Sequence, residues 1–111
     1  MDIEWLGDSH DVVCGCSKDV RRAIGGELYL LQIGEEPLHA RPMKTVGQGV
    51  WELRISEKEG EFRVLYVVKR SDRIYVLHVF RKKAQKTPQK HIGLAKDRLK
   101  QIKQTKGMTE K

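Results

Sequence analysis

The chain has 111 residues, of which 33% are charged and 39% hydrophobic, and this size suits one soluble domain with a single modest core. Its 22 basic and 15 acidic residues give a net charge of +7, and no apolar run reaches the roughly 20 residues that span a bilayer. The charged first residues lack the pattern of a secretory signal, so we expect a cytoplasmic protein. We expect one domain over residues 1–104 and a polar tail over 105–111.

The first sixteen residues predict a strand and a short helix. Residues 1–6 alternate between apolar and acidic side chains, which is typical of a strand, and the helix is expected over 8–13. Cys14 and Cys16 are separated by one residue, which is too short for an ordinary disulfide or a four-ligand zinc site. We expect two reduced thiols; a metal site that recruits His10 is the alternative.

A second, longer helix is predicted to follow. Ser17 is a suitable N-cap, and Gly34 and Pro37 end the helical pattern. The apolar residues that recur at three- and four-residue steps are Val20, Ile24, Leu28 and Leu31.

From residue 44 onward the apolar pattern has a period of two, which indicates antiparallel strands. Strands are expected over 50–55, 62–69 and 74–80, with a hairpin loop at 57–60 and a tight turn at 71–72. The predicted fold class is therefore α+β: a small antiparallel sheet with two N-terminal helices on one face and a C-terminal helix. The predicted order is strand, two helices, three strands, helix.

The last helix is predicted to begin at Thr87 and Pro88, with the threonine as N-cap and the proline at the first helical position. One apolar stripe runs along this otherwise basic helix. The stripe consists of Ile92, Ala95, Leu99 and Ile102.

Two arginines, Arg54 and Arg63, lie inside strands that otherwise read as buried. A guanidinium keeps its charge, so such a position is costly unless the side chain meets an anion or faces a charged groove. Alternation places both arginines on the face opposite the bulkier apolar residues. If the helices cover those apolar residues, both arginines emerge on the uncovered face. At least one cation of the run 81–83 should reach the same face.

The charge is divided unevenly along the chain. Residues 1–40 hold eight acids and three bases, a net charge of −5, and the remaining residues hold 19 bases and seven acids, a net charge of +12. Clustered lysine and arginine bind nucleic-acid phosphates through counterion release. We therefore favour nucleic-acid binding for residues 81–103 over a merely solvated basic surface.

Several segments together resemble a known family. They are GVWELR at 49–54, FRVLYV at 62–67 and above all YVLHVFRKKAQKTP at 75–88, with further similarity at 3–7 and 28–34. In order and spacing, they resemble the phage-derived, HigB-like branch of the RelE/ParE toxin superfamily. The resemblance implies the RelE-type fold, a small antiparallel sheet flanked by helices.

The same resemblance implies the toxin of a type II toxin-antitoxin pair. Most such toxins are ribosome-dependent endoribonucleases that cut mRNA in the decoding site, by attack of the RNA 2′-hydroxyl and without a metal or cofactor. Arg63 matches the arginine expected to clamp the scissile phosphate, Arg54 would assist it, and Lys83 matches the basic residue that would act as the acid.

The resemblance leaves the general base open. Lys82 or Lys83 is a possible base if neighbouring cations lower its pKa. Glu52 shares the predicted face of Arg54 and is another possible base, although we expect it to pair with the arginines. His78 is expected to be a hydrogen-bonded core residue, and His39 and His91 ordinary exposed ones. Further RNA-binding residues are expected to be Phe80, Arg81, Lys82, Lys86 and Thr87.

The implied partners are a helix-turn-helix antitoxin and the ribosome with its mRNA. The sequence leaves open whether the antitoxin would bind over the helices or over the basic groove. Two other functions also stay open: poisoning of DNA gyrase, which occurs in the same superfamily, and nucleic-acid binding without cleavage by a phage-derived protein.

Overall fold

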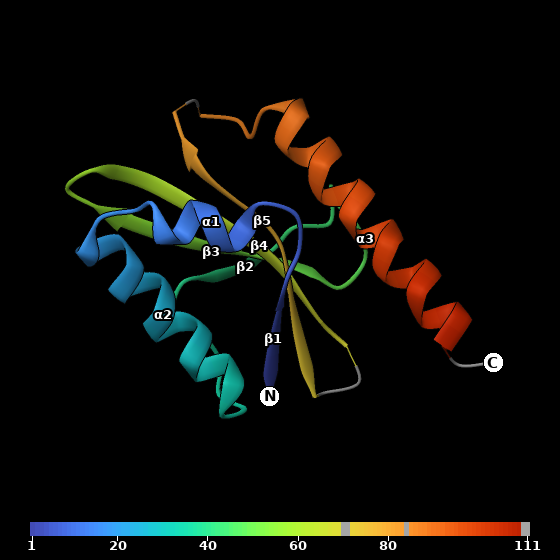
Figure 1. Ribbon diagram of the computed structural model, residues 1–111. Helices are drawn as coiled ribbons and strands as arrows, with labels where there is room; N and C mark the ends of the chain where they lie inside the picture. Colours follow the sequence, from blue (N-terminus) through green and yellow to red (C-terminus); the bar gives the residue numbers. More distant parts are fainter. Residues whose placement is uncertain (70–71, 84, 110–111) are drawn as a thin grey trace.

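The computed structural model describes residues 1–69, 72–83 and 85–109, with side chains described as far as residue 102. It is an α+β fold in which three helices flank a five-stranded sheet of strand order β1-β5-β4-β3-β2 (Figure 1). The elements in chain order are β1 (Asp2–Trp5), α1 (Ser9–Cys14), α2 (Lys18–Gln32), β2 (Ala40–Pro42), β3 (Val50–Glu57), β4 (Gly60–Lys69), β5 (Arg73–Lys82) and α3 (Gln89–Thr109). The predicted fold class is confirmed.

The sheet is mixed, where a wholly antiparallel sheet was predicted. Strands β2 to β5 pair antiparallel, but β1 pairs parallel with β5 at the opposite edge from β2. Alternation within a strand reports its faces and not the direction of its neighbour, so the parallel pair was invisible in the sequence. Strand β2 was missed because three residues are too few to establish a period.

Helix α2 begins and ends as the sequence predicted. The Ser17 hydroxyl accepts a hydrogen bond from Val20 N at 3.3 Å, and Gly34 adopts a positive φ of 82° just after the helix. The predicted apolar stripe is buried against the sheet. Helices α1 and α2 thus cover one face of the sheet.

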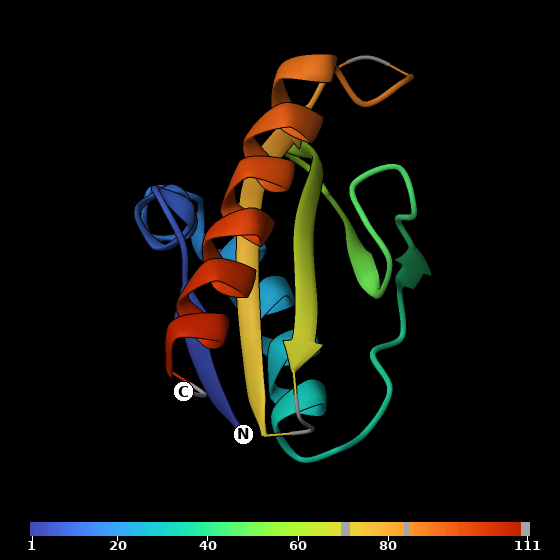
Figure 2. The same cartoon turned by 90° about the vertical axis from the view of Figure 1, so that its right-hand side faces the viewer.

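Helix α3 lies on the opposite face, in front of β4 and β5 in the view of Figure 2. Its predicted apolar stripe is buried against Val50, Leu65, Val67 and Leu77. The face that was expected to be uncovered is therefore covered in part. The reason is that β4 and β5 carry apolar side chains on both faces, as strands of a sheet buried on both sides do.

The start of α3 differs by one residue from the prediction. The carbonyl of Pro88 accepts hydrogen bonds from His91 N at 3.0 Å and Ile92 N at 3.3 Å, so Pro88 rather than Thr87 is the N-cap. The helix continues to Thr109, into the segment expected to be a polar tail.

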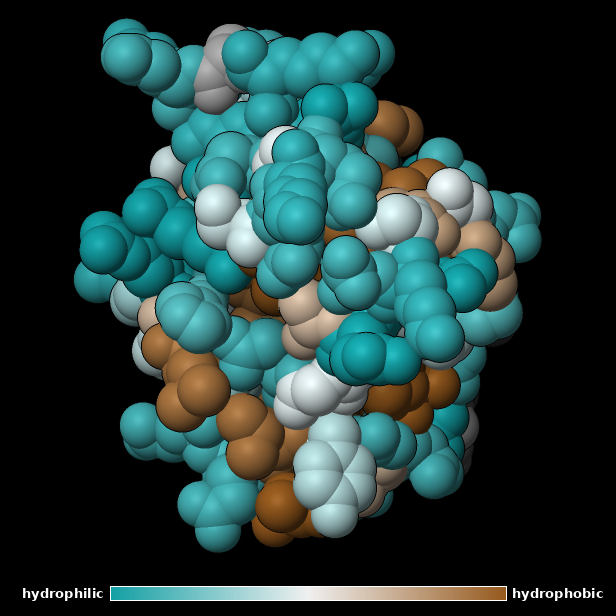
Figure 3. All heavy atoms as spheres, turned by 90° about the vertical axis from the view of Figure 1, so that its left-hand side faces the viewer, coloured by the Kyte–Doolittle hydropathy of each residue, from teal (hydrophilic) through white to brown (hydrophobic). Residues whose placement is uncertain are grey.

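The outer surface of the molecule on the side of α1 and α2 is mostly hydrophilic, with apolar residues gathered in the lower part of the view in Figure 3. At the end of α2 and in the following loop, Tyr29, Ile33 and Leu38 are large hydrophobic residues with exposed side chains. Among the described residues, no helix is both long enough and apolar enough to cross a membrane.

Candidate active site

Polar side chains from β3, β4 and β5 gather on the sheet face that α3 partly covers. The strand register places Arg54, Arg63 and Phe80 side by side in one row across the three strands. Ser56, Glu61 and Lys82 form the next row toward the β3–β4 hairpin, and Glu52, Leu65 and His78 form the next row in the other direction. The polar residues of these three rows, together with Phe80 and with His91 of α3, are the candidate site.

A β-bulge in β5 determines two members of the site. Leu65 pairs with His78 whereas the next residue of β4, Tyr66, pairs with Val76, so Leu77 is an extra residue without a partner. Such a residue reverses the alternation of the strand beyond it. His78 and Phe80 therefore face α3, although regular alternation from Val76 would turn them toward α2.

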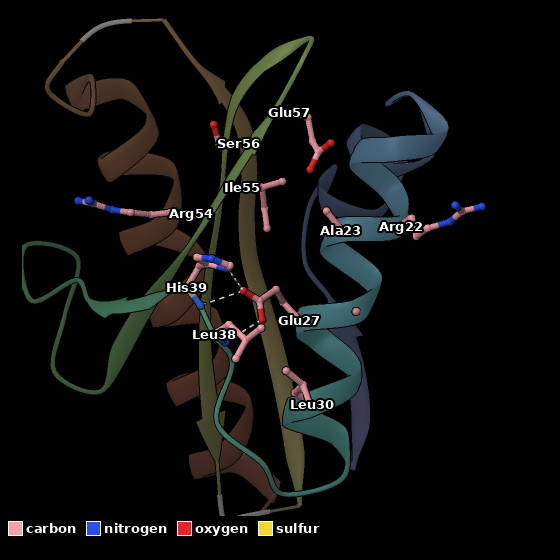
Figure 4. Close-up of a pocket in the computed structure, with 11 residues that line it drawn as sticks. Arg22, Ala23, Glu27, Leu30, Leu38, His39, Arg54, Ile55, Ser56 and Glu57 are labelled. Atoms are coloured by element: carbon pink, nitrogen blue, oxygen red, sulfur yellow. Dashed lines mark hydrogen bonds and ion pairs between the residues drawn. The ribbon is translucent and has the colours of Figure 1, made fainter.

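The two arginines share this face, as predicted, and a buried carboxylate lies between them. Arg54 Nε donates to Glu52 Oε1 at 3.0 Å, and Arg63 Nε lies 4.0 Å from the same oxygen. In Figure 4, Arg54 points away from α2 whereas Ile55 points toward it. The expected pairing of Glu52 with the arginines is confirmed.

The Arg63 side chain is unusually buried for one that is always charged. Its side chain is 7% exposed, and its NH1 donates to Phe62 O at 3.1 Å. Its Nε is buried and finds no hydrogen-bond partner among the described residues. A buried donor without a partner costs stability, which is typical of side chains placed for function.

Glu61 is a second carboxylate of the site, and the sequence interpretation missed it. Its Oε2 accepts a hydrogen bond from the Ser56 hydroxyl, and its Oε1 lies 3.4 Å from Arg63 NH1. The Ser56 hydrogen bond, helped by Arg63 and Lys82, holds the pKa of Glu61 below its usual value, against a smaller effect of burial. Glu61 is therefore an ionised, half-exposed carboxylate beside Arg63.

Two histidines meet within the site. His78 Nε2 and His91 Nδ1 are 2.7 Å apart, and the His91 ring stacks on Phe80 with centroids 4.0 Å apart at an angle of 12°. Burial lowers the pKa of His78 to about 4, and it lowers that of His91 as well. The prediction that His78 is buried and hydrogen-bonded is confirmed. The position of His91 beside it depends on the bulge and on helix packing, for which the sequence carries no signal.

The basic residues that follow Phe80, at 81–83, lie in different places. Lys82 pairs with Glu61 in the register, whereas Lys83 follows the strand and is exposed. Arg81 pairs with Phe62 and so belongs to the opposite face, where it donates to the carbonyl of Glu59. Lys82 is therefore the member of this run that the register brings to the site.

The remaining predicted RNA contacts lie around α3's first turn. Lys86 is exposed and Thr87 half-buried in the segment that leads to α3. Phe80 is 4% exposed, so its ring is packed beneath His91 and is not open to an RNA base.

A separate cavity of about 450 Å³ opens on the other side of the sheet, between α2, the loop that follows it and β3 (Figure 4). Glu27 at its wall accepts hydrogen bonds from Leu38 N and His39 N, both at 2.9 Å, and lies 2.8 Å from His39 Nδ1. The carboxylate is fully engaged in fastening the loop to α2, so its role here is structural.

The two cysteines lie near the end of α1. Cys14 Sγ is 3.7 Å from His10 Nδ1, and Cys16 Sγ donates to Val12 O at 3.2 Å. Within the described part of the chain, no three histidine, cysteine or carboxylate side chains are grouped as metal ligands.

Comparison with protein families identifies a match over most of the chain. The family described as "Phage derived protein Gp49-like (DUF891)" matches residues 13–100. No curated protein matches it.

Proposed function

The chain belongs to the phage-derived Gp49-like protein family, and from this membership and the geometry of the site we propose that it is a type II toxin. In this proposal it is a ribosome-dependent endoribonuclease of the RelE/HigB type that cleaves mRNA in the cytoplasm. Its partners would be a helix-turn-helix antitoxin and the ribosome carrying mRNA. The family match supports a phage-derived, toxin-like protein, and the site supports the chemistry.

One observation carries the proposal: the row of Arg54, Arg63 and Phe80, with carboxylates on both sides and a histidine stacked above it. Two guanidinium groups in one row can hold a phosphodiester and the charge that develops on it. A buried arginine with an unpartnered donor is hard to explain by stability alone. The site therefore suits an anionic ligand.

The proposed reaction is an intramolecular transesterification. The RNA 2′-oxygen loses its proton to a base and attacks the adjacent phosphorus, while the bond from phosphorus to the 5′-oxygen breaks. The leaving 5′-oxygen takes a proton from an acid, and the upstream fragment keeps a 2′,3′-cyclic phosphate. Arg63 and Arg54 neutralise the non-bridging oxygens during this step.

Two residues of the row nearest the β3–β4 hairpin can act as the base and the acid in these proton transfers. Both carboxylates have partners, but Glu61 is ionised and half exposed, so an RNA hydroxyl can reach it, whereas Glu52 is buried behind Arg54. We assign the base to Glu61. Lys82, opposite Glu61 in the register, carries a proton for the leaving oxygen, with Lys83 next to it as the residue that the family resemblance favours.

The experiment is induced expression of the wild type without antitoxin, with primer extension on cellular mRNA. We expect cuts at defined codon positions from the wild type and none from Arg63→Ala. Arg54→Ala and Arg73→Ala form a matched pair, because both side chains are about 42–43% exposed and both pair with a glutamate, although Arg73 also lies 4.0 Å from Asp2. Arg54→Ala should reduce cutting about tenfold or more, and Arg73→Ala should leave it unchanged.

Other outcomes would contradict the proposal. Intact mRNA together with gyrase-dependent DNA breaks would identify a gyrase poison. Intact mRNA and intact DNA would identify a binding protein that cuts nothing. Cleavage of purified RNA without ribosomes would contradict ribosome dependence alone.

A further inference from the structure

A chain of polar contacts runs from the turn before α1 to the candidate site. Arg98 of α3 lies 3.2 Å from Asp8 through NH2, and its NH1 donates to Leu77 O at 2.9 Å and to His78 Nδ1 at 3.0 Å. His78 Nε2 then lies 2.7 Å from His91 Nδ1. We call Asp8, Arg98, His78 and His91 the histidine chain.

The donors and acceptors of the histidine chain can be assigned in order, starting from Arg98. A guanidinium only donates hydrogen bonds, so His78 Nδ1 must be the acceptor of the bond from Arg98. A neutral His78 then carries its proton on Nε2 and donates it toward His91 Nδ1. His91 Nδ1 is in turn an acceptor, and the proton of a neutral His91 is on Nε2.

The ring of His91 lies against the row that contains Arg54, Arg63 and Phe80. It stacks on Phe80, which is the cross-strand neighbour of Arg63. His78 is 3% exposed whereas His91 is half-buried. Since Nε2 is on the far side of the ring from the bond to His78, it is directed away from the buried pair.

From this arrangement we propose that His91 contacts RNA as a fixed hydrogen-bond donor, giving its Nε2 proton to a phosphate oxygen held by Arg63. Arg98 and His78 are positioning residues, which act by fixing the tautomer of His91. The identity of the ligand rests on the proposed function. The tautomer rests on the contacts alone.

Burial and the charges around the two rings keep them neutral. Burial has the largest effect on His78; Arg98, His91 and Lys90 also lower its pKa, and Asp8 opposes them only in part. Burial and Lys90 act on His91 in the same direction, with Asp8 again opposing. Arg63 of β4 adds a permanent cation beyond Phe80. A neutral imidazole with one fixed proton is the expected state of His91 at neutral pH.

The hydrogen bonds of the histidine chain also exclude His91 as the general base. Nε2 can take a proton only if the proton that His91 already carries moves to Nδ1 first, and the cation that results also has a proton on Nδ1. In either case Nδ1–H would face His78 Nε2, which would then have to accept while Nδ1 of the same ring accepts from Arg98. A neutral imidazole has one acceptor nitrogen, so the arrangement fails.

The first test reads the tautomers directly, by long-range proton–nitrogen NMR of protein with ¹⁵N-labelled histidine at pH 7. We expect protons on Nε2 of both His78 and His91. A proton on Nδ1 of His91 overturns the proposal. In Arg98→Met the fixing donor is absent, so mixed tautomers are expected, and unchanged tautomers would remove Arg98 from the chain.

The second test adds inorganic phosphate to the same labelled protein. A shift of the His91 Nε2 resonance, absent in Arg63→Met, is expected if the donor and the arginine share an anion. No shift in the wild type would overturn the contact. This result is independent of RNA cleavage, so it separates a failure of this inference from a failure of the proposed function.

The third test compares His91→Gln with His91→Ala in the mRNA cleavage experiment. The glutamine amide offers an N–H donor near the position of Nε2 but no base. We expect the glutamine variant to keep cleavage within about threefold and the alanine variant to lose about 10- to 100-fold. Equal losses in both variants would contradict the donor role, and equal retention would contradict the contact.

Discussion

Arg54 and Arg63 lie directly opposite each other on β3 and β4, and Glu52 lies between their guanidinium groups. Like charges in facing positions of an antiparallel pair repel each other. One buried carboxylate therefore holds two cations together, and Glu61 pairs with Arg63 as well. With Lys82 opposite Glu61, the site holds three cations and two carboxylates, so a net positive charge is available to a phosphate.

Removal of the Glu52 charge should destabilise the fold. Glu52→Gln keeps the size of the side chain but leaves the buried Arg63 facing Arg54 without an anion between them, and we expect a loss of about 2 kcal/mol in the free energy of unfolding. Urea denaturation measures it. Glu4→Gln is the control, because it breaks the exposed 2.7 Å pair with Arg73 and should cost less than about 1 kcal/mol. Equal losses would show that burial of the pair is unimportant.

The opposite result is expected for Arg63. Arg63→Met removes a buried cation whose Nε has no hydrogen-bond partner in the described part of the structure, and it leaves Glu52 paired with Arg54. The unsatisfied buried charge disappears with the side chain, and the buried Glu52 is not left without a cation because it keeps its hydrogen bond to Arg54. We expect the melting temperature to be unchanged or higher and mRNA cleavage to be lost. A clear fall in melting temperature would mean that Arg63 is retained for stability.

Stability should fall on mild acidification because of His78. Its pKa is about 4 in the folded protein against 6.5 ordinarily, so between these values the unfolded chain binds a proton that the folded protein does not. The stability is complete above about pH 6.5 and declines as the pH falls toward 4, by at most about 3 kcal/mol.

The lowered pKa of His91 acts in the same direction. Urea denaturation at pH 7.5, 6 and 4.5 follows the decline. The same series on His78→Gln should show a smaller decline, since the titrating group is absent. Identical pH profiles for the two proteins would contradict the assignment to His78.

Lys82 should matter more than Lys83. The register places Lys82 opposite Glu61 on the site face, whereas Lys83 follows the end of β5. We expect Lys82→Ala to slow mRNA cleavage about tenfold or more, as for loss of a general acid, and Lys83→Ala to change it less than threefold. Primer extension over a time course gives both rates. The reverse order would favour the residue that the family resemblance indicates.

The sequence was sufficient for features that depend on local pattern. The stripe of α2 and the shared face of Arg54 and Arg63 follow from periods of 3.6 and 2. The cap at Ser17 follows from the preference for serine at the N-cap position. The place of α3 was missed although the sequence carried a signal for it. It depends on the second apolar face of β4 and β5, which the continuous apolar run 64–68 indicates.

The histidine pair could not be predicted. Within a regular strand, His78 would share a face with Val76 and would point toward α2. Its actual direction depends on the unpaired Leu77, and periodicity carries no mark of a single extra residue. His91 joins it only after α3 packs, through contacts between residues 13 positions apart in the chain.

The bulge also determines how far along β5 the helix can sit. Hydrophobic contact has no direction, so on a regular strand the axial position of α3 would depend on side-chain packing alone. The carbonyl of the extra residue, Leu77, accepts a hydrogen bond from Arg98 and gives the helix one axial position. His91 is seven residues before Arg98, two turns earlier on the same side of α3. A slide of one residue, about 1.5 Å, would break that bond and would also carry the imidazole past Phe80, so a single unpaired residue in a strand aligns the helix with the site.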